Sequence, residues 1–143
     1  MSAELLKHFI SSLQQDVQRL DTLSQLLDQQ YELMSRRSSE PLQQLNQQAL
    51  ELMTAVQHNH NARDSLLQQF GLPNTAAGLR QLVSRLPAPL QHGTRQLLQE
   101  LTLKSRLCQA KNEKSGKLLA SQRQLMQKLT GLQSRTSYPA MPL

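Results

Sequence analysis

A leucine repeat with a period of seven residues runs through the first 36 residues of the chain. The repeat consists of Leu6, Leu13, Leu20, Leu27 and Met34, and a second seam three residues earlier consists of Ala3, Ile10, Val17, Ser24 and Tyr31. Two such positions per heptad are typical of helices that pack as coiled coils. The repeat therefore predicts a helix over residues 3–36, about 50 Å long at a rise of about 1.5 Å per residue.

The other side chains of this helix indicate how it packs. Further apolar residues widen the stripe beyond the repeat, which suits a bundle of more than two helices; they are Leu5, Phe9, Leu23, Leu26 and Leu33. The acidic residues lie off the repeat, and we expect them to face water; they are Asp16, Asp21, Asp28 and Glu32.

The composition argues against a β-sheet protein. The chain contains 30 Leu and 22 Gln, but only one Ile, three Val and no Trp. Strands favour β-branched and aromatic side chains, whereas Leu and Gln lose little rotamer freedom in a helix. Because only 38% of the 143 residues are hydrophobic, we expect an elongated helical bundle with a thin core.

Turn signals divide the rest of the chain into three more helices. Arg36–Pro41 is the first break, and the helix after it loses its apolar pattern at residues 57–63, which either protrude or hold a polar layer. Gly71 and Pro73 end that helix, and Thr75 caps a short helix that runs through Leu86. The last helix is expected from about Leu90 to Leu132, and its continuity at Gly116 stays open.

These elements predict an all-α fold, an elongated antiparallel bundle of three long helices plus one short helix with coiled-coil-like packing. Residues 1–132 form a single domain in this interpretation. Residues 133–143 contain two prolines and no periodic pattern, so we expect a flexible tail.

Charge is distributed unevenly between the two halves of the chain. Residues 1–64 contain five Lys or Arg and eight Asp or Glu, a net charge of −3, whereas residues 65–143 contain eleven and two, a net charge of +9. Either the acidic half packs against the basic half, or the basic half offers a surface to an acidic partner.

The signatures of enzymes are missing from the sequence. It has no Gly-rich phosphate loop, no nucleophile elbow and no zinc-binding helix motif, so we expect no catalysis, no cofactor and no small-molecule substrate. His58 and His60 are two residues apart on a helix and cannot share a metal ion. Cys108 is the single cysteine, and its leucine-rich surroundings predict a small core residue. A single cysteine cannot form an internal disulfide, so a reducing cytoplasm is the expected location. No apolar run is long enough to insert into a membrane.

A helical interaction module fits what remains. The apolar residues in the second half of the last helix either bind an amphipathic helix of a partner or complete the chain's own core. The alternatives are a scaffold that self-associates through the first-helix seam and, from charge alone, a basic helical nucleic-acid-binding protein.

Two short motifs suggest a family. Asn112–Leu119 (Asn-Glu-Lys-Ser-Gly-Lys-Leu-Leu) is followed by Thr136–Ala140 (Thr-Ser-Tyr-Pro-Ala), and Gly71-Leu72-Pro73, Gly78-Leu79 and Leu86-Pro87 precede them. In this order, and after a heptad-containing first helix, the motifs resemble those of the FlgN family of flagellar export chaperones. The resemblance implies a cytoplasmic, non-enzymatic chaperone that binds hook-associated proteins of the hook–filament junction and delivers them to the flagellar export gate.

We assign residues to these roles as a hypothesis. An apolar cargo groove is expected on the second half of the last helix, where Asn112 and Gly116 would allow close approach or bending. The apolar cargo-binding residues in this assignment are Leu118, Leu119, Leu125, Met126 and Leu129. Tyr138 in the tail is expected to bind the export gate, because one aromatic ring gives a large contact area for little lost freedom.

Overall fold

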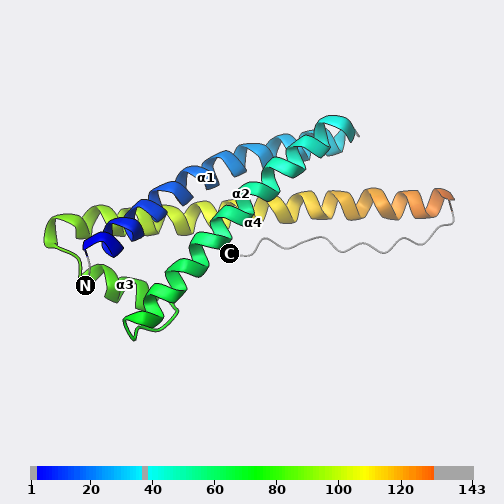
Figure 1. The fold of residues 1–143 in the computed structure, drawn as a ribbon. Coiled ribbons are helices and arrows are strands. Elements are labelled where there is room, and N and C mark those ends of the chain that lie inside the picture. The colour runs from blue at the N-terminus through cyan, green and yellow to red at the C-terminus, as the bar shows by residue number, and fades with distance from the viewer. Residues whose placement is uncertain (1–2, 37–38, 131–143) are drawn as a thin grey trace.

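The computed structural model describes residues 3–36 and 39–130, except for the side chains of Ser39, Leu119 and residues 121–130. The described part contains four helices and no strand, which confirms the all-α prediction (Figure 1). The helices are α1 (Ala3–Ser35), α2 (Ser39–Gln69), α3 (Ala76–Ser84) and α4 (Ala88–Thr130).

Helix α1 is the central element of the arrangement. It packs against both α2 and α4, while α3 packs across the ends of α2 and α4 (Figure 1). The long helices alternate in direction along the chain, so α1 and α4 run in the same direction. Among the described elements, the backbones of α2 and α4 do not approach each other closely, although side chains of both helices enter the same apolar clusters. The bundle is therefore open on one side.

The leucine repeat of α1 forms the core, as the sequence predicts. Its five members Leu6, Leu13, Leu20, Leu27 and Met34 are all buried. Phe9 and Leu23 are buried as well, so the apolar stripe is wider than a two-stranded coiled coil requires. Because this seam is covered by the chain's own helices, it is not available for a scaffold to self-associate.

The expectation that Asp16 faces water is wrong, because its side chain is 0% exposed. It lies at the contact between α1 and α2, among residues from a segment more than 40 positions later in the sequence. Asp21 and Asp28 do lie at the surface, as predicted.

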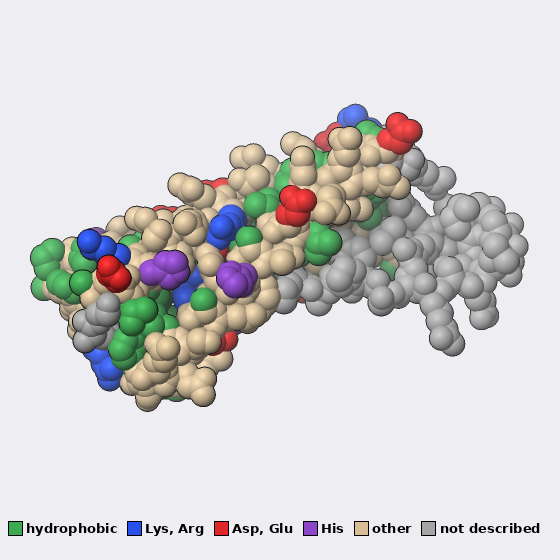
Figure 2. Space-filling view, in the orientation of Figure 1, with side chains coloured by type: hydrophobic (Ala, Val, Ile, Leu, Met, Phe, Trp, Pro, Cys, Tyr) green, Lys and Arg blue, Asp and Glu red, His purple; other side chains and the backbone are tan. Residues whose placement is uncertain are grey.

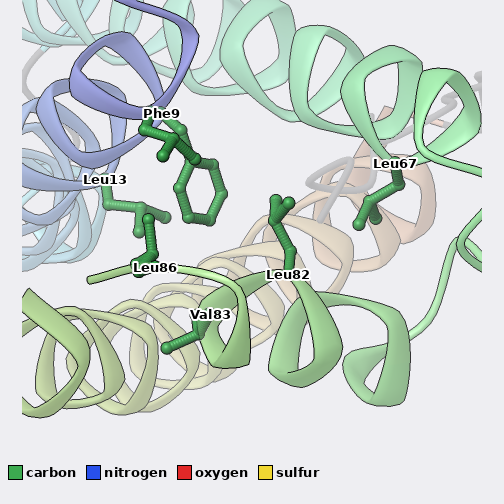
Figure 3. Packing of buried hydrophobic residues seen from close by; sticks show 7 residues of the cluster. Phe9, Leu13, Leu67, Leu82, Val83 and Leu86 are labelled. Carbon is green, nitrogen blue, oxygen red and sulfur yellow. The ribbon is translucent and has the colours of Figure 1, made fainter. Parts of the chain in front are cut away.

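A compact apolar cluster forms at the end of the bundle where α3 lies. Phe9 and Leu13 of α1 meet Leu67 of α2, and Leu82, Val83 and Leu86 of the α3 segment close the cluster (Figure 3). Leu97, Leu98 and Leu101 of α4 pack against its edge. Side chains from all four helices therefore converge here.

The turn from α2 to α3 explains the glycine and proline residues in this part of the sequence. Gly71 adopts a left-handed φ of 66°, and the Leu72 amide donates to the Leu67 carbonyl oxygen at 2.9 Å, which closes α2 as predicted. The Gly78 amide donates to the Thr75 hydroxyl at 3.2 Å, the predicted cap of α3. A Cβ atom at Gly78 would lie only 1.8 Å from the Pro73 carbonyl oxygen.

Helix α4 differs slightly from the prediction at its start. It begins at Ala88 and not at about Leu90, because Pro89 fits the first turn, where no amide hydrogen is needed. The helix continues through Gly116 without a break, which answers the question that the sequence left open.

Candidate functional site

A buried polar layer joins α1 to α2. The Arg63 guanidinium donates to the Asp16 carboxylate at 2.7 Å, and the Asn59 amide donates to it at 3.0 Å. Arg19 adds a third contact at 3.0 Å. Of the two explanations for the apolar gap at residues 57–63, the polar layer is therefore correct. Every charge in it is paired, so the layer is structural and fixes the alignment of the two helices.

A row of contacts aligns α1 with α4. Lys104 Nζ lies 2.6 Å from an Asp21 carboxylate oxygen, and Lys111 Nζ lies 2.8 Å from one of Asp28. Both pairs are 83 residues apart in sequence, as expected for two parallel helices in a constant register. These contacts favour the interpretation that the acidic half of the chain packs against the basic half.

Cys108 lies in the core between α1 and α4, as predicted. Its thiol donates to the Leu20 carbonyl oxygen at 3.3 Å. Burial raises the pKa of the Cys108 thiol from its ordinary value of 9.0 to about 11, although the nearby Lys111 ammonium opposes the shift. The thiolate is the reactive form, so this cysteine is unreactive near neutral pH.

The predicted cargo-binding residues lie in the second half of α4. Asn112 is buried, with 6% of its surface exposed, and Gly116 and Leu118 are half-buried. A partner could contact Asn112 only after α4 moved. The side chains of Leu119, Leu125, Met126 and Leu129 lie outside the described residues, as does the whole of Tyr138.

The backbone of this half of α4 extends past its neighbours. The 83-residue register places Ser35, the last residue of α1, opposite Leu118. Helix α2 begins at Ser39, beside the end of α1. Residues 119–130 therefore continue beyond both helices, over about 18 Å at about 1.5 Å per residue (Figure 1).

A groove that the sequence did not predict follows the first half of α4. Next to α3 it is about 510 Å³ in volume and is lined by Leu79, Leu98 and Leu103, among others. Next to α2 it continues with about 270 Å³, lined by Val56 and Leu101 among others. The two parts share Thr102, and we call them together the α4 groove. It lies between α4 and the two helices α3 and α2, whose placement against α4 no periodicity in the sequence encodes.

The rest of the described surface gives no sign of a metal site or a membrane span. Figure 2 shows polar and charged side chains scattered over α2, with hydrophobic side chains gathered at the end where α3 lies. His60 Nε2 lies 3.4 Å from an Asp64 carboxylate oxygen. In the described ranges, no group of three or more His, Cys, Asp or Glu residues could hold a metal ion. None of the described helices is both long and apolar enough to span a membrane.

A family model described as FlgN protein matches residues 1–137. The chain belongs to the FlgN family. A crystal structure of a Pseudomonas aeruginosa protein assigned as the flagella synthesis protein FlgN has the same fold, with a TM-score of 0.72 and 25% sequence identity. The match covers 90% of this chain and 98% of that one. A search of curated protein sequences gives no significant match.

Membership in the FlgN family accounts for the absence of catalytic motifs. The family is one of flagellar export chaperones and not of enzymes. Its members are therefore expected to act through binding surfaces, and the two features of α4 described above, the extension and the groove, are the candidates.

Proposed function

We propose that this FlgN-family chain is a cytoplasmic chaperone that holds hook-associated proteins of the hook–filament junction and delivers them to the flagellar export gate. One observation carries the proposal: the backbone of residues 119–130 extends past α1 and α2. The sequence of this extension is amphipathic and contains Leu119, Leu125, Met126 and Leu129. A helix that extends past the other described helices can bury such residues against a guest helix.

The energetics favour this role. Junction proteins of this kind, by the family resemblance, end in amphipathic helices that associate during assembly. Burial of such a helix contributes about 25 cal/mol for each Å² of apolar surface removed from water. Met126 suits a site that accepts more than one cargo, because methionine side chains repack easily. No nucleotide is needed for binding of this kind.

The two alternative functions are less well supported. A scaffold that assembles through the α1 seam would need leucines that are already buried within one chain. A nucleic-acid-binding protein would need a continuous row of free cations along α4, and two lysines of that row, Lys104 and Lys111, are paired with carboxylates of α1.

The cargo site can be tested by a double substitution, Leu119→Asp with Met126→Asp. We expect it to abolish binding of a purified hook-associated protein, measured by isothermal titration calorimetry, while the thermal unfolding of the bundle is unchanged. The matched control, Ser121→Asp with Gln124→Asp, adds the same charge to the same segment without removing apolar surface, and should retain binding. Full-strength binding by the first variant would exclude this site.

The proposed role of Tyr138 needs a separate test. We expect Tyr138→Ala to leave cargo affinity unchanged and to reduce export of the cargo in a motility and secretion assay. Tyr138→Phe, which keeps the ring, should export normally. An equal loss of cargo affinity and export would instead place Tyr138 in the cargo site or in the fold.

A further inference from the structure

We propose that the α4 groove is a second docking site, for an acidic amphipathic helix of a partner protein. The groove lies on the open side of the bundle, between α4 and the two helices α3 and α2, and it is separate from residues 119–130. The proposal is independent of the cargo assignment, because either site could be occupied without the other.

The floor of the groove is apolar and incompletely covered. Leu79 of α3 and Leu98 of α4 line it, and Leu103 lies at its edge with 65% of its surface exposed. The next turn of α4 presents Leu107, another exposed leucine. Neighbouring exposed leucines beside an apolar groove are typical of a protein-binding surface, whereas isolated ones are not.

The charges around the floor have one sign. Arg80 and Arg95 line the part next to α3, and Arg106 lines the part next to α2. No Asp or Glu is among the lining residues of either part. Within the described ranges, the guanidinium groups of Arg80 and Arg106 make no hydrogen bond or ion pair, and that of Arg95 contacts only the Gln91 amide oxygen, at 3.3 Å. These guanidinium groups are available to carboxylates of a partner.

The length of the groove matches a short helix. From Arg95 to Gln109 it follows α4 for about 21 Å at about 1.5 Å per residue, which is the length of a helix of about four turns. An amphipathic helix with leucines on one face and Asp or Glu along its edges would fill the floor and meet the arginines.

Two occupants from the chain itself fit less well. Residues 131–143 contain Arg135 and no acidic residue, and Pro139 and Pro142 are poor in a helix. In a second copy, α1 is the most acidic helix, but Asp16, Asp21, Asp28 and Glu32 are already paired with cations of their own chain.

The test uses two synthetic peptides of 16 residues with the same helical leucine face. One carries Glu along both edges, and the other carries Lys at the same positions. We expect fluorescence anisotropy to show that the full chain binds the Glu peptide at least about tenfold more tightly, since three exposed ion pairs of about 0.5 kcal/mol each give this ratio. Binding should weaken as salt is added.

Variants locate the site on the molecule. Arg95→Glu with Arg106→Glu should reverse the preference between the peptides, and Leu103→Glu should abolish binding of both. Thr102→Tyr, which fills the middle of the groove, should do the same without a charge change. The controls Leu50→Glu, at an exposed leucine of α2 outside the groove, and Lys7→Glu should bind within about twofold of the original chain.

Several results would overturn the proposal. They are equal affinity for the two peptides, no binding of the Glu peptide, and groove variants that behave like the controls. Displacement of the Glu peptide by a synthetic peptide of residues 131–143 would make the chain's own tail the occupant. A dimer in sedimentation equilibrium that Leu103→Glu dissociates would make a second copy the occupant. These outcomes do not depend on the cargo site. If residues 119–130 turned out not to bind junction proteins, the peptide results for the α4 groove would stay the same.

Discussion

The two ends of the bundle differ in how completely they are closed. At the α3 end, side chains from all four helices converge on Phe9, Leu13 and Leu82 (Figure 3). At the other end only three helices remain, and polar groups enter the interior: the Gln30 amide donates to Asn46. Within the described residues, the buried Oγ of Ser115 has no hydrogen-bond partner. The comparison teaches that one apolar core can be complete at one end of a bundle and interrupted by polar groups at the other.

The polar layer lies between these two ends, and breaking it should have the largest effect. Arg63→Met leaves the buried Asp16 carboxylate without its main partner, and we expect the free energy of unfolding in urea to fall by about 4 kcal/mol. The double variant Asp16→Leu with Arg63→Met should recover most of this loss, because it leaves no buried charge. A double variant as unstable as the single one would show that the layer contributes net stability to the fold.

The same truncation at the two ends gives the most direct comparison. Leu82→Ala should lower the free energy of unfolding by about 3 kcal/mol, because four helices surround the cavity and cannot collapse into it. Leu27→Ala, at an equally buried site of the open end, should cost about 2 kcal/mol, since its surroundings can relax. Equal losses in urea unfolding would contradict the difference between the ends.

The closed end also depends on a close contact in its loop. Gly78→Ala should destabilise the fold by about 2 kcal/mol, because the added methyl group would collide with the Pro73 carbonyl group and displace the loop. Gly93→Ala, in α4, is the matched control. Its Cβ would have no atom within 4 Å, so we expect a gain of up to about 1 kcal/mol from helix propensity. Thermal unfolding of the two variants measures both changes.

The smallest effect concerns the ion pairs that align α1 and α4. Lys111→Met removes the contacts to Asp28 and to the Ser24 hydroxyl, and we expect a loss of about 0.5 kcal/mol at low salt that disappears in about 1 M NaCl. Lys7→Met serves as the control for the loss of an exposed lysine. A loss that persists in high salt would mean that the methylene groups of Lys111, and not its charge, hold the helices.

The sequence was sufficient for features that depend on local patterns. The heptad leucines predicted both α1 and its buried face. Gly71 predicted the C-terminal end of α2, and Thr75 predicted the start of α3. These features follow from neighbours in the chain, where helix periodicity and capping act directly.

Features that depend on the approach of distant segments could not be predicted. Burial of Asp16 requires Asn59 and Arg63 from another helix, and nothing at position 16 itself indicates that contact. The α4 groove depends on how α3 and α2 are placed against α4, which side-chain spacing does not specify. Residues 119–130 were predicted as a helix, but their extension past α1 became evident only from the register between α1 and α4.

The parallel course of α1 and α4 has a practical consequence for anyone handling the protein. Ala3, at the start of α1, and Leu86, next to the start of α4, line the same hollow of the surface. The 43-residue α4 then leads about 65 Å away from that point. An affinity tag or a surface linker attached before α1 would be well separated from residues 119–130, whereas the same attachment after α4 would lie where the guest is expected.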